Sequence, residues 1–446
     1  MTELLPPGPK PLIPLLMLDQ FRRKPLDFIR QMTATYGDTV YFNVPGVGRY
    51  FLFNNPESIQ QILVTRQHSF HKGRGLRRLQ NLLGNGLVTS EDELHLRQRR
   101  MIQPMFHRQR IAGYAEAMVA ITSHFAAGWR DGVSLDIHAE MSYLTMLIVN
   151  KTLFSMDIES SARELNDVIS TIVTSYTYTI GPVGRLRMRL PLPYTKRILA
   201  ARARLENAVQ ELIDQRRQEG DCGDLLSMLV AARDAEDENR QMSDKQVRDE
   251  ALTLFLAGNE TTANALTWTF YLLSQHPDVA ARLREELDGV LHGRDPNYAD
   301  LESLPYTRMV FSEAMRLYPP AWIMLRTPVE DVQISGYSVT KGSSVILCQW
   351  ITQHNERYYP DPFRFDPERW AADDKASPRP KLAYFPFGAG ARTCMGESFA
   401  WMEGILVLAT LAQKWDMRLE PGFNVELLPE LTLRPKHGIR MILQRR

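Results

Sequence analysis

Cys394 ends a glycine-rich segment and is the residue of this chain best placed to bind a metal. The segment is Phe387-Gly388-Ala389-Gly390-Ala391-Arg392-Thr393-Cys394-Met395-Gly396, and a helix is expected from Met395 onward. Glycines allow tight turns and let the backbone approach a flat ligand closely. Backbone N–H groups at a helix N-terminus stabilise a thiolate, the form of cysteine that metals bind. Because an isolated cysteine is more often a small buried apolar side chain, the segment alone indicates only a stabilised thiolate.

The same segment resembles the haem-binding loop of the cytochrome P-450 superfamily, Phe-x-x-Gly-x-Arg-x-Cys-x-Gly, at every fixed position. The resemblance implies heme b (iron protoporphyrin IX) as cofactor, with Cys394 as the axial ligand of the iron and Phe387 and Gly388 beside the porphyrin. A thiolate ligand pushes electron density onto the iron and favours O–O cleavage. The expected protein is a haem-thiolate monooxygenase, which inserts one atom of O2 into a C–H bond of a hydrophobic substrate.

A second chemical group lies in the longest predicted helix, from Ser243 to His276. In its middle, Ala257-Gly258-Asn259-Glu260-Thr261-Thr262 places glycine and polar groups in an apolar helix and is similar to the family pattern Ala/Gly-Gly-x-Asp/Glu-Thr. The resemblance implies that Ala257 and Gly258 border the haem, Thr261 helps to bind O2, and Glu260 relays protons. O–O heterolysis needs two protons, so an acid beside a hydroxyl suits it. The alternative is a kinked core helix whose threonine bonds back to its own backbone.

Two further segments match the family. Glu313-Ala314-Met315-Arg316 is similar to its Glu-x-x-Arg motif, and Pro367-Glu368-Arg369-Trp370 is similar to its Pro-Glu-Arg-aromatic segment. On its own, such an i, i+3 pair is a common surface pair worth a few tenths of a kcal/mol. The resemblance implies instead that Glu313, Arg316 and Arg369 form a structural network behind the Cys394 segment.

Four cations are expected to bind the haem propionates. Arg392 belongs to the Cys394 segment, and Arg326 matches a propionate-binding position of the family. His95 and Arg99 lie four residues apart on a predicted helix, Leu94–Met101, and therefore share a face. They fit the form of the family motif in which histidine comes first; the alternative is that His95 is only a surface residue.

The elements that carry these residues predict a mainly α-helical fold with a smaller β-rich region. Residues Val40–Phe53 predict a hairpin, Asn55–Tyr318 is mostly helix-like, and Val332–Leu347 predicts short strands. The resemblance implies the cytochrome P-450 fold, a triangular helical body with a long central helix crossing over the haem. Residues 1–446 are expected to form one such domain, without a fused reductase.

Charge and cysteine usage limit the partners and the compartment. With 53 Lys+Arg and 52 Asp+Glu the net charge is +1, which gives no general attraction to nucleic acid or to an anionic membrane. Three cysteines without a Cys-x-x-Cys pair are not a disulfide framework and fit a cytoplasmic protein.

The N-terminal stretch Leu4–Leu18 is apolar, but prolines interrupt it, so no transmembrane segment is expected. We expect an arm packed on the core. The alternative is that its apolar residues touch a membrane surface or cover a pocket mouth; these are Leu12, Ile13, Leu15, Leu16 and Leu18.

Electrons are expected from a separate ferredoxin or flavodoxin with its NAD(P)H reductase, because no Gly-x-Gly-x-x-Gly motif opens a helix after a strand. A basic run occupies a region that lies near the cysteine side of the haem in this family. It would dock an acidic redox protein by charge complementarity, or it is an ordinary solvated face. The run is Arg97, Arg99, Arg100, Arg108 and Arg110.

The segments expected to line the substrate pocket are apolar, which suits a fatty acid, terpenoid or carotenoid-like substrate. Two rival functions are a peroxide-driven peroxygenase and a non-catalytic haem-based gas sensor; an isomerase or lyase acting on peroxides is a third. The pair Glu260 and Thr261 argues against all three. The apolar residues are Leu79, Leu82, Leu83, Leu254, Phe255, Ala257, Ile323, Met324 and Leu433.

Overall fold

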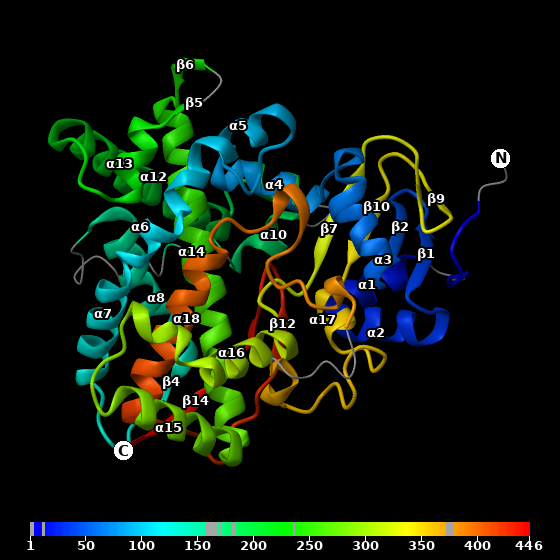
Figure 1. Ribbon diagram of the computed structural model, residues 1–446. Helices are drawn as coiled ribbons and strands as arrows, with labels where there is room; N and C mark the ends of the chain where they lie inside the picture. The colour runs from blue at the N-terminus through cyan, green and yellow to red at the C-terminus, as the bar shows by residue number, and fades with distance from the viewer. Residues whose placement is uncertain are drawn as a thin grey trace. The chain divides into compact units, whose positions relative to one another are not determined.

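The computed structural model describes residues 4–10, 14–156, 168, 171–172, 174–180, 184–234, 237–371 and 379–446. The chain is mainly helical with smaller sheets, as predicted (Figure 1). It divides into two compact units, Met1–Arg77 with Met315–Cys394 and Arg78–Ala314 with Met395–Arg446. The division passes through helices α4 (Arg74–Leu83) and α16 (Pro305–Leu317) and just after Cys394. The prediction of one domain over residues 1–446 stays a prediction.

The first unit contains a five-stranded sheet in the order β1-β2-β10-β7-β3. The predicted hairpin is confirmed: β1 (Thr39–Val44) and β2 (Gly48–Phe53) are antiparallel. Strand β10 (Ser344–Leu347) runs parallel to β2 and antiparallel to β7 (Met324–Pro328), which pairs with β3 (Phe70–Lys72). The predicted strands in 332–347 are also confirmed, since a separate hairpin, β8 (Val332–Ile334) with β9 (Tyr337–Val339), precedes β10.

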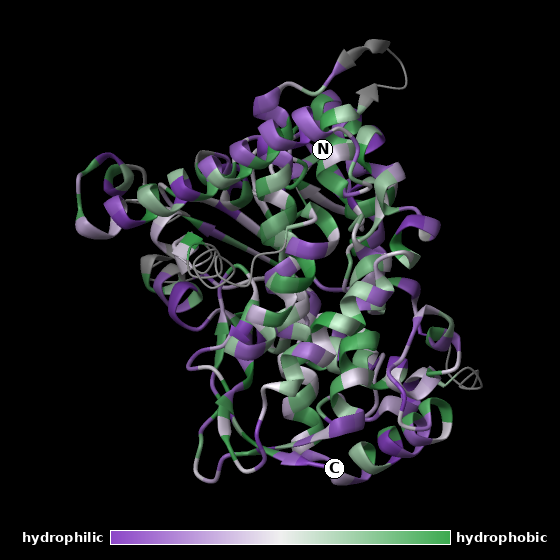
Figure 2. Ribbon diagram, turned by 90° about the vertical axis from the view of Figure 1, so that its left-hand side faces the viewer, coloured by the Kyte–Doolittle hydropathy of each residue, from purple (hydrophilic) through white to green (hydrophobic). Residues whose placement is uncertain are grey.

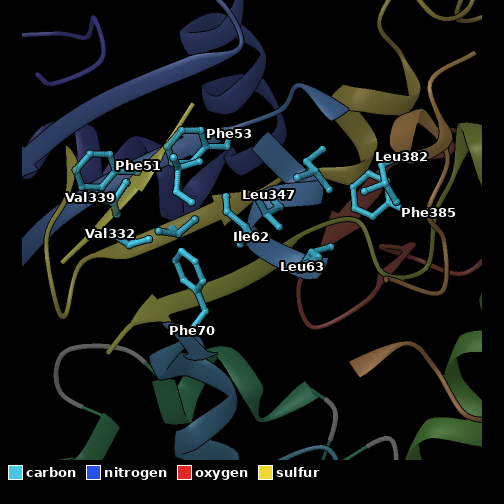
Figure 3. Packing of buried hydrophobic residues seen from close by; sticks show 13 residues of the cluster. Phe51, Phe53, Ile62, Leu63, Phe70, Val332, Val339, Leu347, Leu382 and Phe385 are labelled. Atoms are coloured by element: carbon cyan, nitrogen blue, oxygen red, sulfur yellow. The ribbon is translucent and has the colours of Figure 1, made fainter. Parts of the chain in front are cut away.

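Buried aromatic and aliphatic side chains form the core of this unit (Figure 3). Phe51 and Phe53 of β2 belong to it, together with Ile62 and residues of both hairpins. Leu382 and Phe385 join the same cluster, so the chain just before the Cys394 segment is anchored in the core. Burying such a side chain contributes about 1.5–3 kcal/mol. The helices here are α1 (Pro14–Arg23), α2 (Pro25–Tyr36), α3 (Pro56–Gln60) and α17 (Gln349–Gln353), with short turns at Gln61–Thr65, Gln67–Ser69, Pro367–Trp370, Lys381–Ala383 and Gly390–Arg392.

The N-terminal arm is packed against the strands. The carbonyl of Pro7 accepts from the N–H of Tyr41 at 3.0 Å, and the carbonyl of Leu4 accepts from the N–H of Ser338 at 2.9 Å. Leu16 is 62% exposed. Leu12 and Ile13 lie outside the described residues, and so do the side chains of Leu15 and Leu18. In the described part of the chain, no helix combines the length and apolarity that crossing a bilayer requires.

The second unit is built around α14 (Asp244–Gln275), the long helix predicted from the sequence. Its start is set by a capping box: the Ser243 hydroxyl accepts from the N–H of Gln246, whose side-chain oxygen accepts from the N–H of Ser243 at 3.0 Å. The helix ends before Pro277, which cannot continue it. It packs against α8 (Ile137–Phe154), α12 (Pro193–Glu219) and α18 (Glu397–Lys414) (Figure 1).

The remaining elements of this unit are helices and three small sheets. Apolar and polar residues alternate along most helices in Figure 2, as expected for helices with one packed face. Three small sheets have the orders β11-β14-β4, β12-β13 and β5-β6. The helices are α5 (Asp92–Ile102), α6 (Arg108–Ala112), α7 (Ala115–Ala127), α10 (Tyr176–Ile180), α11 (Gly184–Arg189), α12 (Pro193–Glu219), α13 (Leu225–Ala231), α15 (Pro277–Leu291) and α18 (Glu397–Lys414), with short turns at Gln103–Phe106 and Tyr298–Glu302. The strands are β4 (Ser134–Asp136), β5 (Arg233–Asp234), β6 (Asp237–Gln241), β11 (Trp415–Leu419), β12 (Leu427–Pro429), β13 (Leu433–Pro435) and β14 (Arg440–Arg445).

Candidate active site

The cysteine loop, Phe387–Cys394, is closed by its own backbone. The N–H of Cys394 donates to the carbonyl of Phe387 at 2.9 Å, and the hydroxyl of Thr393 donates to the carbonyl of Gly390 at 2.8 Å. The side chain of Cys394 is exposed. Helix α18 begins at Glu397, because residues 395 and 396 form a turn. The prediction that the helix starts at Met395 is therefore wrong by two residues.

Two glycines let this loop turn and lie close to the protein. Gly388 and Gly390 have φ of 74° and 73°, which side-chain-bearing residues rarely adopt. A Cβ on Gly390 would lie 1.9 Å from the carbonyl oxygen of Leu63. The N–H of Ala391 donates to Oε1 of Gln67 at 2.6 Å. Gly390 thus serves a close contact with the protein backbone, whereas the sequence suggested an approach to a flat ligand.

The exposed thiol fits the iron of a haem. A metal ligand must be reachable, and it is placed accurately only if its backbone is held. Cys394 meets both conditions, because its side chain is exposed and its loop is fixed by backbone bonds and by Gln67.

Arg316 of α16 is a fully buried cation, so the surface-pair alternative is wrong. Its Nη1 donates to the carbonyls of Gln353 and Pro362 at 2.8 and 2.7 Å, and its Nη2 donates to the carbonyl of Arg364 at 3.2 Å. The guanidinium also lies over the ring of Tyr359, 4.9 Å from its centroid. One side chain therefore ties together three points of the segment that leads toward the cysteine loop.

Arg369 follows this segment in the sequence and also binds it. Its Nη2 donates to the carbonyl of Asp361 at 2.9 Å. Both arginines thus bind carbonyls within residues 361–364. Glu313 lies one turn before Arg316 and is also 0% exposed. The contacts of the two arginines agree with the structural role predicted for them.

The centre of α14 presents small side chains on one face. Ala257 is exposed, and Thr261 one turn later is partly exposed, although most of the helix is buried. The hydroxyl of Thr261 donates to the carbonyl of Ala257 at 2.8 Å. The back-bonded threonine that the alternative interpretation expected is therefore present. Since this bond uses the hydroxyl proton, the oxygen of Thr261 is left as an acceptor.

Gly258 is explained by helix packing. A Cβ at this position would meet Cγ2 of Val149, on α8, at 3.0 Å. The space that the glycine leaves is thus on the side of α14 that faces α8.

Glu260 points into a buried polar cluster. It is 9% exposed, and its Oε1 accepts from the Thr432 hydroxyl at 3.0 Å and from Nδ2 of Asn264 at 3.2 Å. Asn264 makes two further contacts: its Nδ2 is 3.2 Å from the Thr432 oxygen, and the Oδ1 of Asn264 is 3.1 Å from Nε2 of His138. Sequence reasoning missed these three partners. Only Asn264, at i+4 from Glu260, could have been found from helical spacing.

The propionate candidates of the second unit lie on α5. His95 is 4% exposed, so the alternative of a surface histidine is wrong. Its Nδ1 lies 3.2 Å from the carbonyl of Leu87 and 3.5 Å from the hydroxyl of Ser90. Arg99, one turn later, is partly exposed. The segment just before α5 therefore fixes the ring of His95 through Nδ1.

The other two candidates belong to the first unit. Arg326 of β7 is 9% exposed and donates to the carbonyl of Leu325 at 3.1 Å. Arg392, in the cysteine loop, is partly exposed. A common role of these four cations at the propionates stays a prediction.

Glu403 of α18 is a buried acid that sequence reasoning overlooked, although a glutamate in an apolar helix is itself a signal. Burial raises its pKa from 4.5 to about 8, and the hydroxyl of Thr262 on α14 opposes this rise only in part. Glu403 is therefore protonated at neutral pH.

Glu403→Gln is expected to remove a pH dependence of stability. Unfolding lets the carboxyl ionise above pH 4.5, whereas the folded protein keeps its proton up to about pH 8. Wild-type stability therefore falls as pH rises through this window, by about 1.4 kcal/mol per unit. From pH 5 to 7 the wild type should lose about 3 kcal/mol more than the variant in urea unfolding. The exposed Glu211→Gln is the control; equal slopes in wild type and Glu403→Gln would contradict the assignment.

Known proteins resemble the chain over its whole length. The family model for Cytochrome P450 matches residues 6–442. Cyclooctat-9-en-7-ol 5-monooxygenase of Streptomyces melanosporofaciens is 39% identical over 93% of this chain and 90% of that protein. Pentalenene oxygenase of Streptomyces avermitilis is 36% identical over 96% of this chain and 94% of that protein. The structure of cyanobacterial CYP120A1 with retinoic acid bound matches with a TM-score of 0.88 and 27% identity, over 100% of both chains.

Proposed function

The chain belongs to the cytochrome P450 family, and on this basis we propose that it hydroxylates a terpenoid at an unactivated C–H bond. Its general activity is that of a haem b monooxygenase, which uses O2, a hydrophobic substrate and electrons from redox partners. The observation that carries the substrate class is the pair of relatives above 35% identity that are named for oxidising terpenoids. The apolar character of the residues expected at the pocket suits such a substrate.

Cys394 is proposed as the iron ligand. When bound, the haem supplies the iron at which O2 is activated, and a thiolate ligand favours O–O cleavage. Phe387 and Gly388 of the cysteine loop would border the porphyrin, and Ala257 and Gly258 would do so from α14. His95, Arg99, Arg326 and Arg392 would bind the propionates. One catalytic domain over residues 1–446 is proposed, and the family match over residues 6–442 supports it.

Glu260 is proposed to supply protons, and Thr261 is proposed to help to hold O2 and a water beside it. The hydroxyl of Thr261 donates to Ala257, so its oxygen can accept a hydrogen bond from a water. Glu260, the residue before Thr261, has a carboxyl group that can pass on a proton. This acid–alcohol pair favours oxygenase chemistry over the peroxygenase and sensor alternatives, which do not need it.

The proposed electron donor is a ferredoxin or flavodoxin with its own reductase. Arg100 and Arg110 are exposed, and Arg97 and Arg99 are partly exposed, so a basic surface is available to an acidic partner. The side chain of Arg108 is outside the described residues. A cytoplasmic location is proposed from the three free cysteines, which suit a reducing compartment.

A spectral titration tests the substrate class. Polycyclic terpene hydrocarbons and alcohols, straight-chain fatty acids and carotenoids are added separately to the ferric holoenzyme, and the Soret band is followed. We expect a saturable low-spin to high-spin shift with terpenoids, because an apolar substrate displaces the water bound at the iron. Hydroxylated product should form with O2, ferredoxin, its reductase and NAD(P)H. A tighter response to fatty acids, or product only with hydrogen peroxide, would contradict the proposal.

A further inference from the structure

A chain of hydrogen bonds in the second unit links the proposed proton donor to a histidine on another helix. It runs from Oε1 of Glu260 to Nδ2 of Asn264 (3.2 Å) and from Oδ1 of Asn264 to Nε2 of His138 (3.1 Å). Thr432 also contacts Glu260, because its hydroxyl donates to Oε1 of Glu260 at 3.0 Å. Asn264 is fully buried, whereas His138, in the first turn of α8, is partly exposed. The chain therefore leads from a partly exposed residue to a buried carboxylate.

The chemistry of Asn264 decides what this chain can transmit. Its amide oxygen can only accept, so Nε2 of His138 carries a proton. Its amide nitrogen can only donate, toward Oε1 of Glu260. An amide does not exchange protons readily, and it therefore conveys position and charge between the two titratable groups rather than protons.

The backbone at His138 is fixed as well. The backbone N–H of His138 donates to Oδ1 of Asp136, the N-cap of α8, at 3.0 Å. The same oxygen accepts from the N–H of Ile439 at 3.0 Å. The start of α8 is thus fixed by two backbone donors, so Nε2 has a defined place.

We propose that His138 is a positioning residue for Glu260: through Asn264 it fixes the carboxylate, and the charge on its ring sets how readily Glu260 takes up a proton. The inference rests on the proposed function, in which Glu260 supplies protons.

Three charged groups act on the ring. Glu260 on α14 and Asp136 at the N-cap attract a proton to it, whereas Arg434 on β13 repels one. Arg434 is itself paired with Glu430 at 2.7 Å. Burial is the largest influence and lowers the pKa of His138 below 6.5. The ring is therefore neutral at pH 7 and gains its charge only in acid.

Because the ring of His138 gains its charge only in acid, coupling is expected to fall as the pH is lowered. In acid, once the ring carries its charge, it stabilises the ionised carboxylate of Glu260. Proton uptake by Glu260 then becomes harder, and more of the consumed electrons should be lost without product. His138→Gln keeps an N–H donor but no titratable charge, so it should remove this acid decline.

The linkage is tested first without turnover. The ten histidines are isotopically labelled, and the pKa of His138 is measured by NMR in the diamagnetic ferrous–carbon monoxide holoenzyme. The signal is assigned with His138→Gln. In Glu260→Gln the carboxylate that attracts the proton is gone, so the pKa of His138 should fall, by about one unit. An unchanged pKa overturns the proposal.

The second readout is coupling, meaning product formed per NAD(P)H consumed, measured across pH. We expect the acid decline in the wild type and in the control His124→Gln, an exposed histidine on α7, but not in His138→Gln. A decline retained in His138→Gln overturns the proposal. Adding His138→Gln to Glu260→Gln should change nothing further. If Glu260→Gln couples like the wild type while the NMR linkage is present, the proton-supply role of Glu260 fails and the linkage stands.

Discussion

Cys394→Ala is expected to abolish the strongly red-shifted Soret band of the reduced carbon monoxide complex and to lower oxygenation at least about a thousandfold. The band arises from thiolate ligation, and no other cysteine can take this place. Cys348 is fully buried, and burial raises the pKa of its thiol to about 12, so it stays protonated. Cys222 is exposed but lies after α12, in a segment that does not match the haem-binding motif found around Cys394.

Cys222→Ala is the matched control, because it removes an exposed thiol and should leave the spectrum and the activity unchanged. Haem content is measured in each variant, so that loss of cofactor is separated from loss of the thiolate ligand. A red-shifted band that persists in Cys394→Ala would disprove the ligand assignment.

Arg316→Ala is expected to have the largest effect on folding. The substitution leaves the carbonyls of Gln353, Pro362 and Arg364 without the cation that binds them. A hydrogen bond to a charged group contributes about 1.5–3 kcal/mol, so the loss is at least about 4 kcal/mol. The net stability of a domain is about 5–15 kcal/mol. We therefore expect little soluble holoenzyme and, where it forms, a lower urea midpoint.

Arg316→Lys keeps the charge but cannot place the planar fork on three carbonyls, and its stability should lie between those of the wild type and Arg316→Ala. The exposed Arg100→Ala serves as control for the loss of an arginine. Stability of Arg316→Ala within about 1 kcal/mol of the wild type would show that the three carbonyls do not depend on this side chain.

Features encoded by nearby residues could be predicted from the sequence. The β1–β2 hairpin has its turn at Pro45-Gly46 between apolar strands, and α14 is delimited by the Ser243 cap and Pro277. The first residue of α18 was missed, because residues 395 and 396 form a turn that no helical pattern announces. Strands β3 and β7 were missed as well, since each is short and its pairing partner is distant in sequence.

In the candidate site, too, only features encoded by nearby residues could be predicted from the sequence. The motif around Cys394 is local, and so is the pair Glu260-Thr261. The surroundings of Glu260 come from three separate segments, so nothing in the sequence joined it to Thr432 or His138. A motif can identify a residue with a chemical role, but it does not identify the side chains from other segments that contact this residue in the fold.

The contact of the cysteine loop with Gln67 has a consequence for biosynthesis. Oε1 of Gln67 receives the N–H of Ala391 across 324 residues of sequence. At about 5–20 residues per second, a ribosome needs roughly twenty seconds to one minute to make that length. The carbonyl of Leu63, against which Gly390 packs, is made equally early. The nascent chain therefore carries one half of the contacts that hold the cysteine loop long before the other half is translated, and cofactor capture by the proposed ligand Cys394 would wait for the last stretch of synthesis.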